Sequence, residues 1–65
     1  MNYEVRVVNP KTNEECDVVV SLSTAQVEAV KGLECWMEYV QALAQPDIPA
    51  GFMPIGNRVR PVTQH

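Results

Sequence analysis

The chain has 65 residues, with five basic and eight acidic side chains and a formal net charge of −3 at pH 7. A domain of this size buries only about 60% of the surface that its unfolded chain exposes, so it has little room for a catalytic cleft. Hydrophobic residues make up 46% and charged residues 20% of the chain, a composition typical of a folded domain that excludes a disordered one. We therefore expect one small domain over residues 1–65.

A β-hairpin is predicted over residues 3–22. Residues 3–8 and 15–22 are rich in β-branched residues, and each alternates so that one face is mostly apolar. Such alternation is typical of strands with one buried face. The connection begins with Asn9 and Pro10, a pair that favours a turn, and Asn13 tolerates the left-handed backbone that closes a loop.

One long amphipathic helix is predicted over residues 23–44. Ser23 and Gln26 have the spacing of a capping box, and Leu22 and Val27 stand at the two positions of a hydrophobic staple. Pro46 restricts the residue before it and ends the helix. The predicted helix contains Gly32, which costs roughly 1 kcal/mol relative to alanine inside a helix.

The apolar side chains of this predicted helix fill an arc of about 180°, wider than the ~100° stripe that a surface helix needs. They are Val30, Ala29, Leu33, Trp36, Met37, Val40, Leu43 and Ala44, with Tyr39 at the edge of the arc. A two-stranded hairpin covers only part of this surface. We therefore expect the remainder to meet the C-terminal segment, a second copy of the chain or another protein.

The C-terminal segment, residues 45–65, is irregular but apolar and holds four of the five prolines. Two interpretations are open: it packs back over the helix and completes the core, or it extends as a recognition arm. Residues 57–62 are compatible with a short third strand, which Pro61 would confine to the edge of a sheet. The predicted fold class is α+β, either ββα or ββαβ.

The sequence indicates neither catalysis nor a metal site. Its single histidine, His65, is the last residue, and no nucleotide-binding, metalloprotease or hydrolase motif occurs. Two cysteines, Cys16 and Cys35, are too few for a zinc site, and we expect both to be free thiols. The first residues lack the apolar core of a signal peptide, and no apolar run is long enough for a membrane span. We expect a cytoplasmic protein that needs no cofactor.

A non-catalytic protein-interaction module is the function that this pattern favours. It would bind a larger protein and block or redirect it as a regulator or inhibitor, and its size is typical of the short proteins that phages and mobile elements encode. We also expect a homodimer that uses the same surface. Aromatic and large apolar side chains carry most interface energy, so the candidate interface residues are Trp36, Tyr39, Val40, Leu43, Phe52 and Met53.

A nucleic-acid-linked regulator is the alternative hypothesis. Arg58 and Arg60 are the only clustered basic residues, and they are the candidates for contact with DNA. The acidic face of the predicted helix would instead act by mimicking nucleic acid and occupying the basic groove of a partner. Residues 1–50 carry three basic and eight acidic side chains, which favours a protein partner over direct contact with nucleic acid.

Overall fold

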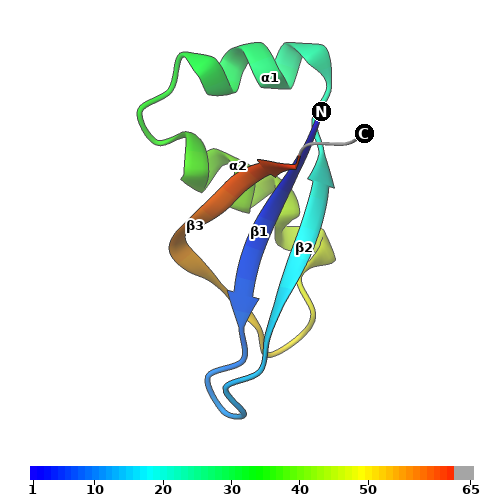
Figure 1. Ribbon diagram of the computed structural model, residues 1–65, viewed down its shortest axis with the longest axis vertical. Coiled ribbons are helices and arrows are strands. Elements are labelled where there is room, and N and C mark those ends of the chain that lie inside the picture. Colours follow the sequence, from blue (N-terminus) through cyan, green and yellow to red (C-terminus); the bar gives the residue numbers. More distant parts are fainter. Residues whose placement is uncertain (63–65) are drawn as a thin grey trace.

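A computed structural model describes residues 1–62 and shows an α+β fold with two helices and a three-stranded antiparallel sheet (Figure 1). The second helix crosses one face of the sheet, and the first lies beyond one end of the strands. Residues 63–65, including His65 and the end of the predicted C-terminal segment, lie outside the described residues. In chain order the elements are β1 (Asn2–Val8), β2 (Glu15–Ser21), α1 (Thr24–Lys31), α2 (Trp36–Ala44), the 3₁₀ turn η1 (Gln45–Asp47) and β3 (Met53–Val62).

The predicted hairpin is confirmed as β1 and β2. The two strands pair antiparallel without a bulge, with Val5 opposite Val18 at the centre. In the connection, the N–H of Asn9 donates to the carbonyl of Glu14 at 2.8 Å, and Asn13 adopts φ 62°. That left-handed backbone is the role that the sequence predicts for the asparagine.

The C-terminal segment is more regular than predicted. In place of an irregular tail with a short strand over residues 57–62, it contains the ten-residue strand β3, which pairs antiparallel with β1 and gives the sheet order β2-β1-β3. Pro61 lies on this edge strand, as expected for a residue that lacks an N–H donor. Val59 is buried, and Ile48 and Phe52 pack against the core. Residues 45–62 therefore complete the core.

A large irregular bulge interrupts the pairing of β3 with β1. The register changes from Val5 opposite Val59 to Val7 opposite Pro54, so residues 55–58 lie opposite Arg6 alone. The side-chain amide of Gln41, on α2, donates to the carbonyls of Ile55 at 3.0 Å and of Gly56 at 3.4 Å. These bonds hold the bulge against α2 and satisfy carbonyls that the irregular pairing leaves out of the ladder.

The single helix predicted over residues 23–44 is wrong, because the chain forms two helices, Thr24–Lys31 and Trp36–Ala44, that run in different directions (Figure 1). Gly32 is the C-cap of α1, and its N–H and that of Leu33 each donate to a carbonyl three residues earlier, both at 3.2 Å. Such bonds tighten the last turn of a helix before it ends. Among the described residues, neither helix has the length and apolar character needed to cross a membrane.

The helix break lets both helices contribute to one core. A continuous helix over residues 24–44 would be about 31 Å long and would point in one direction, whereas α1 and α2 run in different directions (Figure 1). Two shorter helices instead bring Val30 of α1 and Val40 of α2 onto the same core.

The capping box that starts α1 is present as predicted. The amide of Gln26 donates to the Ser23 hydroxyl oxygen at 3.2 Å, and the Gln26 side chain accepts from the Ser23 amide at 2.8 Å. Leu22 is buried and Val27 packs against the core. The hydrophobic staple positions around this N-cap therefore also lie where the sequence places them.

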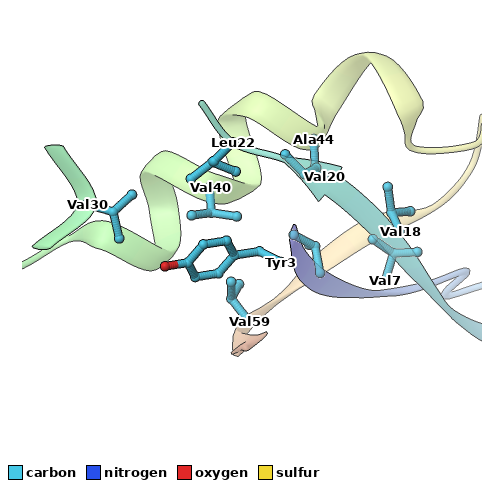
Figure 2. Packing of buried hydrophobic residues seen from close by; sticks show 10 residues of the cluster. Tyr3, Val7, Val18, Val20, Leu22, Val30, Val40, Ala44 and Val59 are labelled. Atoms are coloured by element: carbon cyan, nitrogen blue, oxygen red, sulfur yellow. The ribbon is translucent and has the colours of Figure 1, made fainter. Parts of the chain in front are cut away.

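The core lies between the sheet and the two helices. Tyr3, Val5 and Val7 of β1 face the helices, and Figure 2 shows the Tyr3 ring between Val30, Val40 and Val59. The other buried core residues are Val18, Val20, Leu22 and Ala44. The alternate positions of β1 and β2 are mostly polar or charged, with Val8 and Val19 as the apolar exceptions, and they form the opposite, solvent-facing side of the sheet.

Candidate functional site

An apolar groove opens where the connection between α1 and α2 meets the end of the sheet. Its volume is about 290 Å³, and we call it the apolar groove; it is lined by Tyr3, Val30, Lys31, Leu33, Trp36 and Pro61. The lining residues come from both helices, from the connection between them and from strands β1 and β3. The break between α1 and α2 and the pairing of β3 with β1 are therefore both needed to form it.

Two aromatic rings make the wall of the groove. Trp36 opens α2, and the centroid of its ring lies 6.0 Å from that of Tyr3, with the planes tilted by 58°. This tilted arrangement is one that aromatic pairs prefer. Tyr3 is buried and Trp36 is half-buried, so the rings are fixed by the core and still present one apolar side to the groove.

Leu33 is an exposed large hydrophobic residue in the groove. It lies in the connection between the helices, and 39% of its surface remains accessible. Leaving a leucine in water forgoes the favourable free energy of its burial, about 1.5–3 kcal/mol for the whole side chain. A partner that covered Leu33 would recover part of that free energy.

The structure does not bring the predicted interface residues together. Trp36 lines the apolar groove. Val40 is fully buried in the core, with 0% exposure, and is not accessible to a partner. Tyr39, Leu43 and Phe52 are half-buried and pack against the core. Met53 is 52% exposed but pairs with Val8, at the opposite end of β3 from Pro61.

Trp36 is the one lining residue of the groove that the sequence-based prediction of the interface contained; the other five are Tyr3, Val30, Lys31, Leu33 and Pro61. Leu33 belongs to the predicted apolar arc, and its exposure follows from the helix break that the sequence pattern does not reveal. Tyr3 and Pro61 are opposite each other in the pairing of β1 with β3. That proximity depends on a pairing over a long stretch of chain, and no local motif indicates it.

A second hollow, also of about 290 Å³, lies on the open face of the sheet beside the bulge. Most of the side chains that line it are charged, and they include Glu4, Asp17, Arg6, Arg58 and Arg60. The Arg60 guanidinium pairs with Glu4, with an Nη2–Oε2 distance of 3.0 Å. Arg6 also has carboxylate partners, Glu15 and Asp17. Within residues 1–62, Arg58 makes no side-chain hydrogen bond or ion pair.

The Arg6 guanidinium joins two carboxylates of the neighbouring strand. Its Nε lies 3.0 Å from Oε1 of Glu15, and its Nη1 lies 3.3 Å from Oδ1 of Asp17. The hydrogen bonds that Arg6 donates to Glu15 and Asp17, with the charge of Asp17, raise the pKa of Arg6 above its usual value. Arg6 therefore stays protonated at neutral pH, where it can pair with both carboxylates.

The basic residues proposed for DNA contact are therefore only partly available, because Arg60 is held by Glu4. On α1, Glu28 pairs with Lys31 at 3.3 Å; Glu34, in the connection between the helices, and Glu38, on α2, are exposed. Within residues 1–62 this distribution gives neither a basic stripe nor a dense acidic face.

Side chains that could act in catalysis or bind a metal are dispersed over the described structure. Within residues 1–62, no group of three or more His, Cys, Asp or Glu residues lies close enough together to hold a metal ion. Cys16 is half-buried beside the core and Cys35 is exposed at the start of α2, and both are free thiols. In the described part of the chain, large apolar side chains line one hollow, the apolar groove.

Comparison of the chain with protein-family models, with curated proteins and with solved structures finds no match. The fold and the apolar groove thus define the chain as a small α+β domain whose three-stranded antiparallel sheet is covered on one face.

Proposed function

We propose that this chain is a non-catalytic binding module that engages a larger protein through the apolar groove. The observation that carries this proposal is the position of Leu33, exposed beside the paired rings of Tyr3 and Trp36. Tryptophan and tyrosine dominate the binding energy of many interfaces, especially where the protein holds them rigid. Trp36 was among the predicted interface residues, and Leu33 and Tyr3 extend that surface.

The size of the groove supports a side chain as its occupant. Small-molecule sites usually enclose about 300–1,000 Å³, and this open groove of about 290 Å³ is at the bottom of that range. One large apolar side chain, presented by a loop or helix of the partner, fits such a volume. The occupant we propose is therefore a leucine-like or aromatic side chain on the surface of a larger protein.

The consequence for the partner would be steric. A bound domain of 7.3 kDa covers a surface that the partner would otherwise use, and so blocks or redirects it. We accordingly propose a regulator or inhibitor that acts in the cytoplasm. Its small size also supports an origin in a phage or mobile element.

Matched substitutions test the proposal. Leu33→Asp places a charge in the groove, whereas Met53→Asp makes the same change at a comparably exposed residue at the other end of β3. Tagged wild-type and variant chains would be incubated with a lysate of the organism that encodes them, and captured proteins compared by mass spectrometry. We expect a specific protein that wild type and Met53→Asp retain and Leu33→Asp loses.

The emission of Trp36 provides a second measurement, because it is the only tryptophan in the chain. Titration with the purified partner should change the emission of wild type and leave that of Leu33→Asp unchanged. Equal capture by all three chains, or no change in emission on binding, would show that the partner binds elsewhere.

A further inference from the structure

We propose that the free edge of β2 pairs with the β2 edge of a second copy of this chain, which joins two sheets into one of six strands. This inference goes beyond the proposed binding of a larger protein, because it uses a different surface. It rests on the hydrogen-bonding directions of β2, on the contrast between the two edges of the sheet and on the charges along β2.

The hydrogen bonds at both ends of the hairpin fix which backbone groups of β2 point outward. Met1 and Leu22 exchange bonds at 2.8 and 3.2 Å, and Asn9 donates to the Glu14 carbonyl at 2.8 Å. Bonded and non-bonded pairs alternate along an antiparallel ladder, so even-numbered residues of β2 bond to β1. The N–H and C=O groups of Glu15, Asp17, Val19 and Ser21 consequently point away from β1, and within residues 1–62 β2 pairs with no other strand.

The other edge of the sheet is closed to such pairing. By the same alternation, the β3 residues that lie opposite Tyr3 and Val7 point their backbone groups away from β1. Pro61 lies opposite Tyr3, and Pro54 lies opposite Val7. Proline has no N–H to offer, and the bulge over residues 55–58 further bends this edge. By contrast, β2 is a regular strand of seven residues with no proline and no bulge.

Symmetry and charge select one register. When Val18 lies on the two-fold axis opposite Val18 of the second copy, all seven residues pair, with Glu15 opposite Ser21 and Asp17 opposite Val19. The four outward residues of each copy then form about eight hydrogen bonds, two for each bonded pair. A register centred on Asp17 would oppose two carboxylates, and one centred on Val19 would leave Glu15 unpaired.

The same register continues both faces of the sheet. On the helix side, Val18 meets its own copy, and Cys16 meets Val20, so the apolar row of the core extends across the junction. On the open face, Arg6 already pairs with Glu15 and Asp17 of its own chain and offsets part of their negative charge. Val19, with 53% of its surface exposed, gains a neighbour. Both helical layers lie on one side of the joined sheet.

Charge reversal at Val19 tests the register. In the proposed dimer, Val19→Lys faces Asp17 of the other copy, whereas Val19→Asp sets carboxylate against carboxylate, twice by symmetry. We expect the lysine variant to dimerise at least about tenfold more tightly than the aspartate variant in sedimentation equilibrium. If both variants weaken dimerisation equally, the register is centred on Val19 and the proposal is overturned.

Val19→Pro tests the edge itself. It removes an outward N–H that makes no bond within the monomer, and Val19→Thr, which keeps the N–H, is the control. We expect Val19→Pro to raise the dissociation constant at least about tenfold and Val19→Thr to leave it near wild type. Far-UV circular dichroism of dilute samples shows that each variant folds.

Amide exchange in the wild-type chain provides a readout that does not depend on any substitution. Protection of the amides of Glu15, Asp17, Val19 and Ser21 should rise with protein concentration. A wild-type mass of 7.3 kDa at every concentration, or protection that does not depend on concentration, would overturn the proposal. Because Leu33→Asp lies on the apolar groove, it should leave dimerisation unchanged; a loss of dimer in that variant would place the dimer contact there instead.

Discussion

The ring of Tyr3 lies against the ring of Trp36, with 6.0 Å between their centroids, and so connects the first strand to the first turn of α2. Aromatic pairs of this geometry contribute about 0.5–1.5 kcal/mol beyond the area that they bury. A double-mutant cycle with Tyr3→Leu and Trp36→Leu should reveal a coupling of that size in the free energy of unfolding, measured in urea. Strictly additive losses would show that the two rings act independently.

The two glycines next to turns should respond in opposite directions to alanine. Gly32 has φ −96°, and an added Cβ would lie 3.9 Å from its nearest neighbour, the carbonyl oxygen of Ala29. Gly32→Ala should therefore stabilise the fold by about 0.4–1 kcal/mol, because it restricts the unfolded chain. Gly51 has φ +86°, so Gly51→Ala should destabilise it by about 1–2 kcal/mol. Thermal unfolding of the two variants measures the difference, and a loss of stability in both would contradict it.

The capping box of α1 should be worth about 1 kcal/mol. Ser23→Ala removes the hydroxyl that accepts from the Gln26 amide at 3.2 Å, and an unsatisfied donor at a helix start costs about that much. Thr24→Ala is the control, because Thr24 is exposed and is not the N-cap residue. Chemical denaturation should place Ser23→Ala clearly below wild type and Thr24→Ala close to it.

The prolines of β3 should limit association through that edge. Replacing Pro54 and Pro61 together with threonine restores two outward N–H groups on a strand that has no outer neighbour in the described sheet. We expect the average mass in light scattering to rise more steeply with concentration than for wild type. Arg60→Thr is the control, because it also introduces threonine but at a position whose N–H points toward β1. It should leave the dependence of average mass on concentration unchanged.

Local signals predicted the elements that depend on local chemistry. The alternation in residues 3–8 and 15–22, the turn at Asn9 and the cap at Ser23 each concern neighbours in sequence, and each has its expected place in the structure. The third strand was foreseen only for residues 57–62. Its first half contains Pro54 and the bulge, which conceal the period-2 pattern of a strand.

The helix break and the apolar groove depend on tertiary structure. Continuous helical periodicity runs through Gly32 to Ala44, and no proline interrupts it. The break is visible only in the tertiary structure. Leu33 is exposed in the connection between the helices, and Val40 of α2 is fully buried in the core. Position in the apolar arc therefore could not separate core residues from surface residues.

The order of the strands also bears on how the chain is made. The central strand, β1, is the first to be synthesised, and one of its two neighbours, β3, is the last of the three, with Asn2 opposite Val62. A two-stranded hairpin is only marginally stable by itself. During translation, Tyr3, Val5 and Val7 must wait uncovered until residues 53–62 have left the ribosome. The long-range pairing of β1 with β3 slows folding of this domain relative to a helical bundle of equal length.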